Sequence, residues 1–84
     1  MSSTLVGVTA IIVDNAVQSI PEGFLSASFN NTGDNAAILT QNGQSWTIPS
    51  KGVFELPVRG GNLSWYSVSI DTETNGTVLE CVYF

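Results

Sequence analysis

The sequence predicts an all-β fold, a small antiparallel β-sandwich of jelly-roll or immunoglobulin-like type with six to seven short strands. Runs of Val, Ile, Thr and aromatic residues alternate with turn-forming Gly, Pro, Asn and Asp at intervals of about 8–12 residues. No stretch shows the apolar period of a helix of ordinary length. With 84 residues, the chain is expected to form one domain.

The N-terminal segment, residues 1–23, is expected to contribute one strand and a turn region. Residues 4–13 are apolar on both alternating faces. One face carries Val6, Val8, Ala10 and Ile12, and the other carries Leu5, Ile11 and Val13. Such a strand is either central in a sandwich or covered by a neighbouring subunit. Residues 16–20 are expected to form a helical turn or a short edge strand.

Residues 24–84 are expected to form the body of the sandwich. Alternation and flanking turn residues predict strands at residues 24–30, 36–40, 44–48, 53–58, 63–70 and 77–84. Asn42-Gly43 and Asn75-Gly76 each predict a tight hairpin between the strands on either side. Pro57 cannot donate to a sheet ladder, so residues 53–58 are expected to lie at an edge or to break near their end.

The charge of the chain argues against several classes of partner. Seven acidic residues stand against two basic ones, which gives a net charge of −5. Two cations cannot neutralise a nucleic-acid backbone or hold the chain to an anionic membrane surface. No apolar run reaches the ~18 residues of a membrane span, and no Lys or Arg precedes residues 5–13 as in a signal peptide. A soluble protein that is not secreted by a signal peptide is therefore expected.

The residues needed for catalysis are largely missing. The chain has no His and one Cys, so neither a Ser–His–Asp device nor a Cys/His zinc site can form within it. Cys81 alternates with Leu79 and Tyr83 and is expected to face the core as a small hydrophobe. The acids are scattered over turns and outward faces. Residues 71–76 imitate part of a calcium loop, but Val82 stands where a bidentate Glu is needed, so a plain turn is favoured. We expect a non-enzymatic protein without a catalytic, cofactor or metal site.

The apolar residues exceed what one small sandwich can bury. The strands at residues 4–13 and 77–84 are apolar on both faces, although a sandwich has one core between its two sheets. The surplus is expected to be covered by further copies of the chain or by a larger protein. The predicted interface residues are Val6, Val8, Ile12, Trp65, Val78, Val82 and Phe84.

An alternative function comes from the tryptophans. Trp46 or Trp65 could serve as a stacking platform beside Asn, Gln and Asp side chains, as in a carbohydrate-binding or small-ligand-binding β module. An exposed aromatic ring beside a polar cleft would favour this alternative.

Four stretches also carry a family resemblance. They are Phe29-Asn-Asn-Thr-Gly33, Ala36-Ala-Ile-Leu-Thr-Gln-Asn-Gly43, Trp46-Thr-Ile-Pro-Ser-Lys-Gly-Val-Phe54 and the closing Ile70-Asp followed by Gly76-Thr-Val-Leu79. Over residues 24–84 this pattern resembles small β-sandwich proteins of tailed bacteriophage virions, which decorate capsids, form head fibres or act as tail adaptors. The resemblance implies a virion protein that forms a homo-oligomer, often a trimer, and binds a larger virion protein such as a capsid protein.

Overall fold

The computed structural model describes residues 8–61 and 63–84 and contains eight strands. They are β1 (Thr9–Asp14), β2 (Val17–Ile20), β3 (Ala27–Asn31), β4 (Ala37–Gln41), β5 (Gln44–Ile48), β6 (Val53–Leu56), β7 (Val68–Asp71) and β8 (Val78–Tyr83). The described residues include no helix, and hence none that could cross a membrane.

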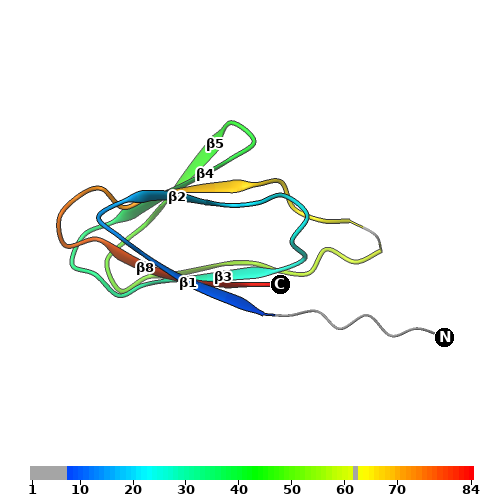
Figure 1. The fold of residues 1–84 in the computed structure, drawn as a ribbon, viewed down its shortest axis with the longest axis horizontal. Helices are drawn as coiled ribbons and strands as arrows, with labels where there is room; N and C mark the ends of the chain where they lie inside the picture. The colour runs from blue at the N-terminus through cyan, green and yellow to red at the C-terminus, as the bar shows by residue number, and fades with distance from the viewer. Residues whose placement is uncertain (1–7, 62) are drawn as a thin grey trace.

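The strands form two four-stranded sheets that lie one above the other (Figure 1). The β1 sheet has the order β1-β8-β3-β6, and the β2 sheet has the order β2-β7-β4-β5. Every strand pair is antiparallel. The expected antiparallel β-sandwich is therefore present, with eight strands in place of the six to seven predicted.

The additional strand comes from residues 16–20, for which the sequence allowed either a helical turn or a short edge strand. Residues 17–20 form the edge strand β2 and not a helical turn. Asn15, with a φ of 51°, bends the chain between β1 in one sheet and β2 in the other. Asn tolerates this left-handed conformation better than most residues, so the bend falls at a favourable position.

The core lies between the two sheets and follows the predicted alternation. Its buried members are Val13, Ile20, Phe24, Ala27, Phe29, Ala37, Leu39, Ile48, Leu56, Val68, Ile70, Leu79 and Cys81. On β1, Val13 is buried and Ile11 packs partly against the core, while Ile12 between them is exposed. This alternation assigns the two faces of β1 as the sequence predicted.

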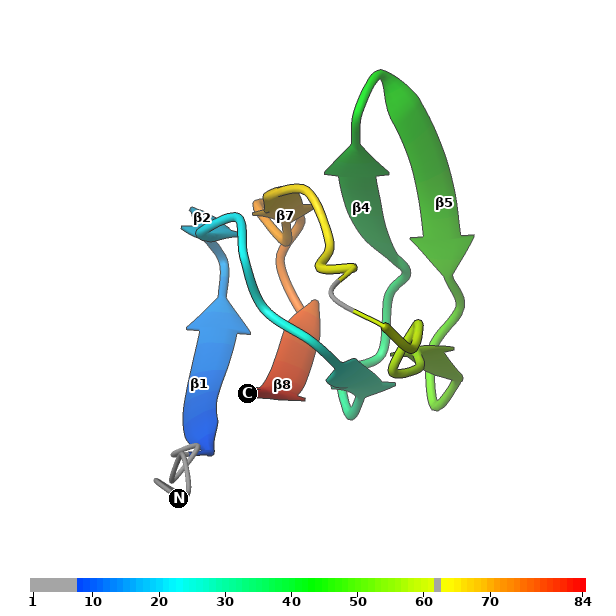
Figure 2. The same cartoon turned by 90° about the vertical axis from the view of Figure 1, so that its right-hand side faces the viewer.

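The first of the two Asn-Gly pairs forms the predicted hairpin. Gln41 lies opposite Gln44 in the β4–β5 pair, which leaves Asn42 and Gly43 as a two-residue loop. Both loop residues have positive φ, 49° and 79°, as a type I′ turn requires. In Figures 1 and 2 this hairpin projects beyond the rest of its sheet.

The hairpin predicted at the second pair, Asn75-Gly76, is wrong. β7 belongs to the β2 sheet and β8 to the β1 sheet, so the chain crosses from one layer to the other between them. The Thr77 N–H donates to the Thr74 carbonyl at 3.0 Å, and only Gly76 of the two central residues has positive φ. This is the pattern of a type II turn, which lacks the twist that matches two paired strands.

Buried Thr72 holds this crossing in place. Thr72 is fully buried, and its hydroxyl donates to the Ala16 carbonyl at 3.0 Å. Its backbone N–H also donates to Ala16, at 2.8 Å. The bend between β1 and β2 is thus tied to the crossing between β7 and β8.

Candidate functional site

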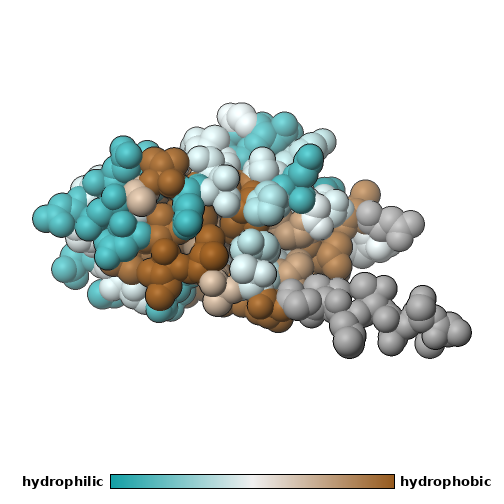
Figure 3. Space-filling model, viewed as in Figure 1, coloured by the Kyte–Doolittle hydropathy of each residue, from teal (hydrophilic) through white to brown (hydrophobic). Residues whose placement is uncertain are grey.

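The outer face of the β1 sheet carries exposed apolar side chains along β1 and β8. Val8 is 64% exposed, Ile12 66% and Val82 43%. Ala10 lies directly opposite Val82 in the β1–β8 register and is also exposed. Figure 3 shows hydrophobic residues gathered on the side of the molecule where β1 and β2 lie.

Toward its other edge the same face carries mostly polar residues. Val82 is followed across the sheet by Ser28 of β3 and then by Glu55 of β6. Glu80 lies opposite Ile12 on one side and Asn30 on the other. Val53 of β6, opposite Asn30, is a further exposed apolar residue on this face, at 61%. The larger group of apolar residues lies at β1 and at the ends of β8.

The C-terminal residue adds an anchored aromatic ring to this surface. Phe84 is 37% exposed, and its N–H donates to the Ser26 carbonyl at 3.1 Å. Its own carbonyl accepts from the N–H groups of Leu25 and Ser26. These bonds extend the antiparallel pairing of β8 with β3, so alternation places the Phe84 side chain on the same face as Val82.

The free edge of β1 is the second feature of this surface. β1 pairs with β8 on one side, and among the described residues no strand pairs with its other side. Strand edges are usually protected by Lys, Pro, a bulge or a covering segment. β1 contains neither Lys nor Pro, and its one charged residue is Asp14 at its end. An edge of this kind, apolar and with its one charge at the end, is a template for pairing with another strand.

The predicted interface residues fall into three groups. Val8, Ile12, Val82 and Phe84 come together on the outer face of the β1 sheet, and Val78 follows the same alternation but is half-buried. Trp65 lies apart, in the connection between β6 and β7. Val6 lies outside the described residues.

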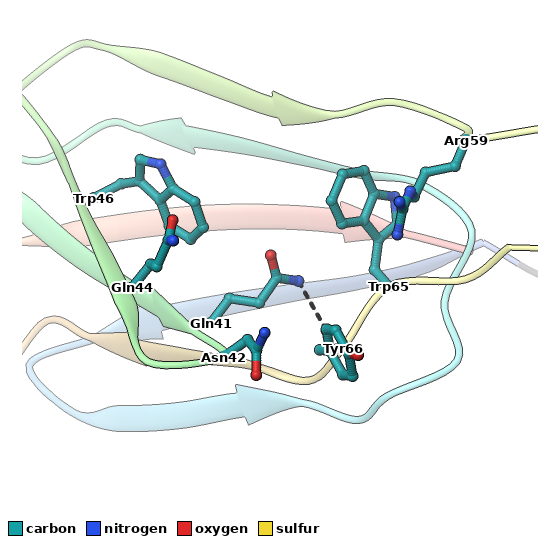
Figure 4. A pocket seen from close by; sticks show the side chains of 7 residues that line it. All are labelled: Gln41, Asn42, Gln44, Trp46, Arg59, Trp65 and Tyr66. Atoms are coloured by element: carbon teal, nitrogen blue, oxygen red, sulfur yellow. Dashed lines mark hydrogen bonds between the residues drawn. The ribbon is translucent and has the colours of Figure 1, made fainter.

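A pocket of about 290 Å³ opens at the opposite edge of the sandwich. Its walls come from the β4–β5 hairpin and from the connection between β6 and β7. The lining residues are Gln41, Asn42, Gln44, Trp46, Arg59, Trp65 and Tyr66 (Figure 4). Aromatic rings and uncharged amides thus dominate its surface.

Trp65 is fixed on one wall by two contacts. Its indole Nε1–H donates to the Pro57 carbonyl at 2.9 Å. The guanidinium of Arg59 stacks on the indole, with Cζ 5.0 Å from the ring centroid. In Figure 4 the guanidinium lies on the side of Trp65 away from Trp46, so the other side of the ring is left toward the pocket.

Trp46 forms the wall that faces Trp65, because the β4–β5 hairpin extends beyond the core. It lies opposite Leu39 on the inner face of the β2 sheet, and its ring packs against Phe54 at a centroid distance of 5.5 Å. The ring remains only half-buried. Gln44, two residues earlier on the same strand, points to the same face by alternation.

Gln41 connects the two walls. Its side chain is 6% exposed, and its Nε2 donates to the Tyr66 carbonyl at 2.9 Å. This bond ties the hairpin to the β6–β7 connection. In Figure 4 the side-chain oxygen of Gln41 points into the space between the two tryptophan rings, where it can accept a hydrogen bond.

Part of this pocket could be predicted from the sequence. The Asn42-Gly43 turn places Gln41 opposite Gln44, and alternation then puts Trp46 on the same face. The contributions of Arg59, Trp65 and Tyr66 carry no such signal, because they depend on how an irregular connection folds back. Asp, which the alternative function invoked beside Asn and Gln, is not among the described residues that line the pocket.

Cys81 is buried in the core, where the alternation of β8 predicted it. Burial raises the pKa of its thiol to about 12 by removing water from the thiolate. The thiolate is the reactive form of cysteine, so this side chain is inert in the native protein near neutral pH.

No protein-family model matches the chain, and neither does any curated protein or solved structure.

Proposed function

We propose that this chain is a non-enzymatic structural protein that self-associates through the free edge of β1 and contacts a larger protein through the apolar outer face of the β1 sheet. The observation that carries the proposal is the row of exposed apolar residues beside an unprotected strand edge. An apolar surface rimmed by Ser, Asn and Glu is typical of a protein–protein contact. Backbone pairing at the edge adds hydrogen bonds that the isolated chain leaves to water.

A second copy of the chain can pair at this edge without bringing the acidic residues of the two β1 strands together. In a twofold antiparallel pairing, residues directly opposite each other point to the same face. With Ile11 opposite its own copy, Ala10 lies opposite Ile12 and Val8 lies opposite Asp14. The two Asp14 carboxylates are then at opposite ends of the paired strands, which avoids like-charge repulsion although each chain carries −5.

Pairing at the edge also leaves the acids of the outer face apart. Glu80 lies on β8 and Glu55 on β6, so neither is on the strand that forms the contact. Face-to-face stacking of two β1 sheets would bring the Glu80 and Glu55 carboxylates of the two copies close together inside the contact. Edge pairing is therefore the arrangement that the charge distribution favours.

The larger assembly in this proposal is a virion of the tailed-bacteriophage kind. Two points support it. The first is the resemblance in residues 24–84. The second is that the order β1-β8-β3-β6 over β2-β7-β4-β5 matches the double-sheet jelly roll found in viral capsid and lectin domains. This second point is an analogy at the level of fold. Capsid and tail genes flanking the coding sequence would support the virion assignment, and an unrelated gene neighbourhood would count against it.

Two charge substitutions test the self-association. Ile12→Lys places an ammonium in the middle of the contact, and Ile38→Lys places one on the outer face of the other sheet. Both parent side chains are exposed, so the fold tolerates either change. Sedimentation velocity is expected to show a shift to monomer for Ile12→Lys and none for Ile38→Lys. Equal effects of the two substitutions would contradict the proposed surface.

A further inference from the structure

The pocket between the β4–β5 hairpin and the β6–β7 connection stands apart from the proposed contact surface. The sheets place β1 and β2 at one edge and β5 and β6 at the other. The contact surface at β1 and the pocket can therefore act independently in the same molecule. A function for the pocket does not depend on whether the chain self-associates.

The pocket combines flat aromatic rings with amides that both donate and accept. Trp46 and Trp65 face each other across it, and Gln41, Asn42 and Gln44 supply the amides (Figure 4). A pyranose ring has the matching chemistry, because C–H groups cover its faces and hydroxyls surround its rim. Each hydroxyl needs both a donor and an acceptor, which a carboxamide can provide at once. Aromatic faces bury the C–H surface without demanding a hydrogen bond.

The two walls are held before any ligand arrives. Trp65 is fixed by the Pro57 carbonyl and by Arg59, and Gln41 is fixed by the Tyr66 carbonyl. A pocket whose side chains are already ordered loses less conformational entropy on binding. The oxygen of Gln41 remains directed into the space between the rings, so the anchored amide still offers an acceptor.

The volume of the pocket and the charge of its lining restrict the class of ligand further. A volume of about 290 Å³ lies at the lower end of the range of about 300–1,000 Å³ for ligand pockets, so the site accommodates one ring rather than an extended molecule. No carboxylate is among the described residues that line the pocket. Glycoside hydrolysis ordinarily needs two carboxyl groups flanking the bond. The pocket therefore has the chemistry to bind a saccharide and not to cleave it.

We infer that this pocket binds one pyranose unit of a saccharide between Trp46 and Trp65, with Gln41 and Gln44 hydrogen-bonded to its hydroxyls. Arg59 acts as a positioning residue that holds Trp65. Arg59, the one cation among the described lining residues, also allows a uronic acid as the bound unit where the sugar carboxylate extends past the edge of Trp65 to the guanidinium behind it. Neutral and acidic sugars share the pyranose chemistry and are separated by experiment.

The test is a titration of the intact protein followed by tryptophan fluorescence. Both tryptophans of the chain line the pocket, so the signal reports on this site. The probes are cellotriose, triacetylchitotriose and trigalacturonic acid. Saturable binding of at least one of them, with a dissociation constant on the order of 1 mM, is expected. Chemical-shift changes of both indole N–H groups in NMR spectra are expected at the same concentrations.

Variants locate the binding. Gln44→Ala removes an exposed amide and is expected to weaken binding about threefold to tenfold. Trp46→Ala is expected to abolish it. Because Trp46 also packs on Phe54, the thermal unfolding of this variant is recorded, and Gln44→Ala carries the test if the fold is lost. Thr47→Ala, on the same strand but paired with Ile38 on the outward face, is the matched control and is expected to bind like the parent chain.

Three results would overturn the inference. The first is no saturable change with any of the three saccharides. The second is binding that persists unchanged in Gln44→Ala and Trp46→Ala. The third is a fluorescence response to adenosine without a response to saccharides, which would assign the aromatic pair to a nucleobase. If trigalacturonic acid alone binds, and Arg59→Ala removes that binding, the acidic sugar is the ligand and the inference stands.

Discussion

Ala10 of β1 lies directly opposite Val82 of β8, and both side chains point to the exposed face of their sheet. An apolar pair of this kind normally lies on the inner face of a sandwich. Here the inner face of the same two strands is already filled, with Val13 opposite Leu79 in the core. One sheet cannot pack both faces within a single domain of this size, so we propose that the larger partner covers the outer pair.

The buried side chain of Asn31 provides a test of the fold. Its amide nitrogen donates to the carbonyls of Asn35 and Ile48, at 2.8 and 3.0 Å, and its oxygen accepts from the Gly33 N–H at 3.0 Å. Asn31→Asp replaces the double donor by an acceptor facing two carbonyls. We expect a loss of about 3 kcal/mol in the free energy of unfolding, measured in urea.

The neighbouring Asn30 is the matched control, because it lies on the same strand and is exposed. Asn30→Asp is expected to change the stability by less than about 0.5 kcal/mol. Acidification should partly restore Asn31→Asp, since the protonated carboxyl regains one donor. Equal stability of the two variants would show that the Asn31 bonds do not hold the loop.

Gly33 tests the close approach between the loop after β3 and the crossing before β8. A Cβ at this position would collide with the Gly76 carbonyl oxygen and the Val78 nitrogen, both of them backbone atoms. Because neither can rotate away, Gly33→Ala is expected to lower the unfolding free energy by about 3 kcal/mol or more.

Gly60→Ala serves as the comparison for Gly33→Ala. Its φ is +85°, but no atom lies within 4 Å of the added Cβ. The expected loss is the ordinary penalty of a left-handed residue, about 1–2 kcal/mol. Thermal unfolding of the two variants should therefore rank Gly33→Ala below Gly60→Ala, and the reverse order would contradict the packing described for the loop.

Cys81 links stability to pH. Its thiol pKa is raised from 9.0 to about 12 in the folded chain by burial, so the native state keeps the proton that the unfolded state loses. Stability from this group is complete below pH 9 and is lost as the pH rises toward 12. The parent chain should lose more stability over this interval than Cys81→Ala does.

Thiol labelling checks the same environment by another route. At pH 8 the native thiol is expected to resist an aromatic disulfide reagent, and the urea-unfolded chain is expected to react at once. Rapid labelling of the native protein would place Cys81 outside the core.

The two Asn-Gly pairs explain how far local sequence could predict this fold. Asn42-Gly43 gives a hairpin because both residues adopt positive φ and the strands on either side share a sheet. Asn75-Gly76 has the same dipeptide, but Thr72 bonds to Ala16 and the strand that follows pairs with β1 and β3. The choice between a hairpin and a crossing was made by contacts far away in sequence, which the dipeptide does not encode.

The candidate surfaces also divide into a part that the local sequence predicts and a part that depends on contacts far away in sequence. Alternation along β1 predicted that Val8 and Ile12 share the outer face, because the period of a strand is local information. Trp65 was predicted to lie in the same interface. The structure places it in an irregular connection, beside Arg59 and across from Trp46. An irregular connection has no period, so the partners of Trp65 could not be predicted from sequence.

The native mass of the unmodified protein tests the central claim most directly. Light scattering over a range of micromolar concentrations is expected to give about twice the chain mass of 8.9 kDa, falling toward 8.9 kDa on dilution. Ile12→Lys should remain near 8.9 kDa throughout. A mass near three times 8.9 kDa would contradict the twofold pairing at β1, and a mass of 8.9 kDa at every concentration would contradict self-association itself.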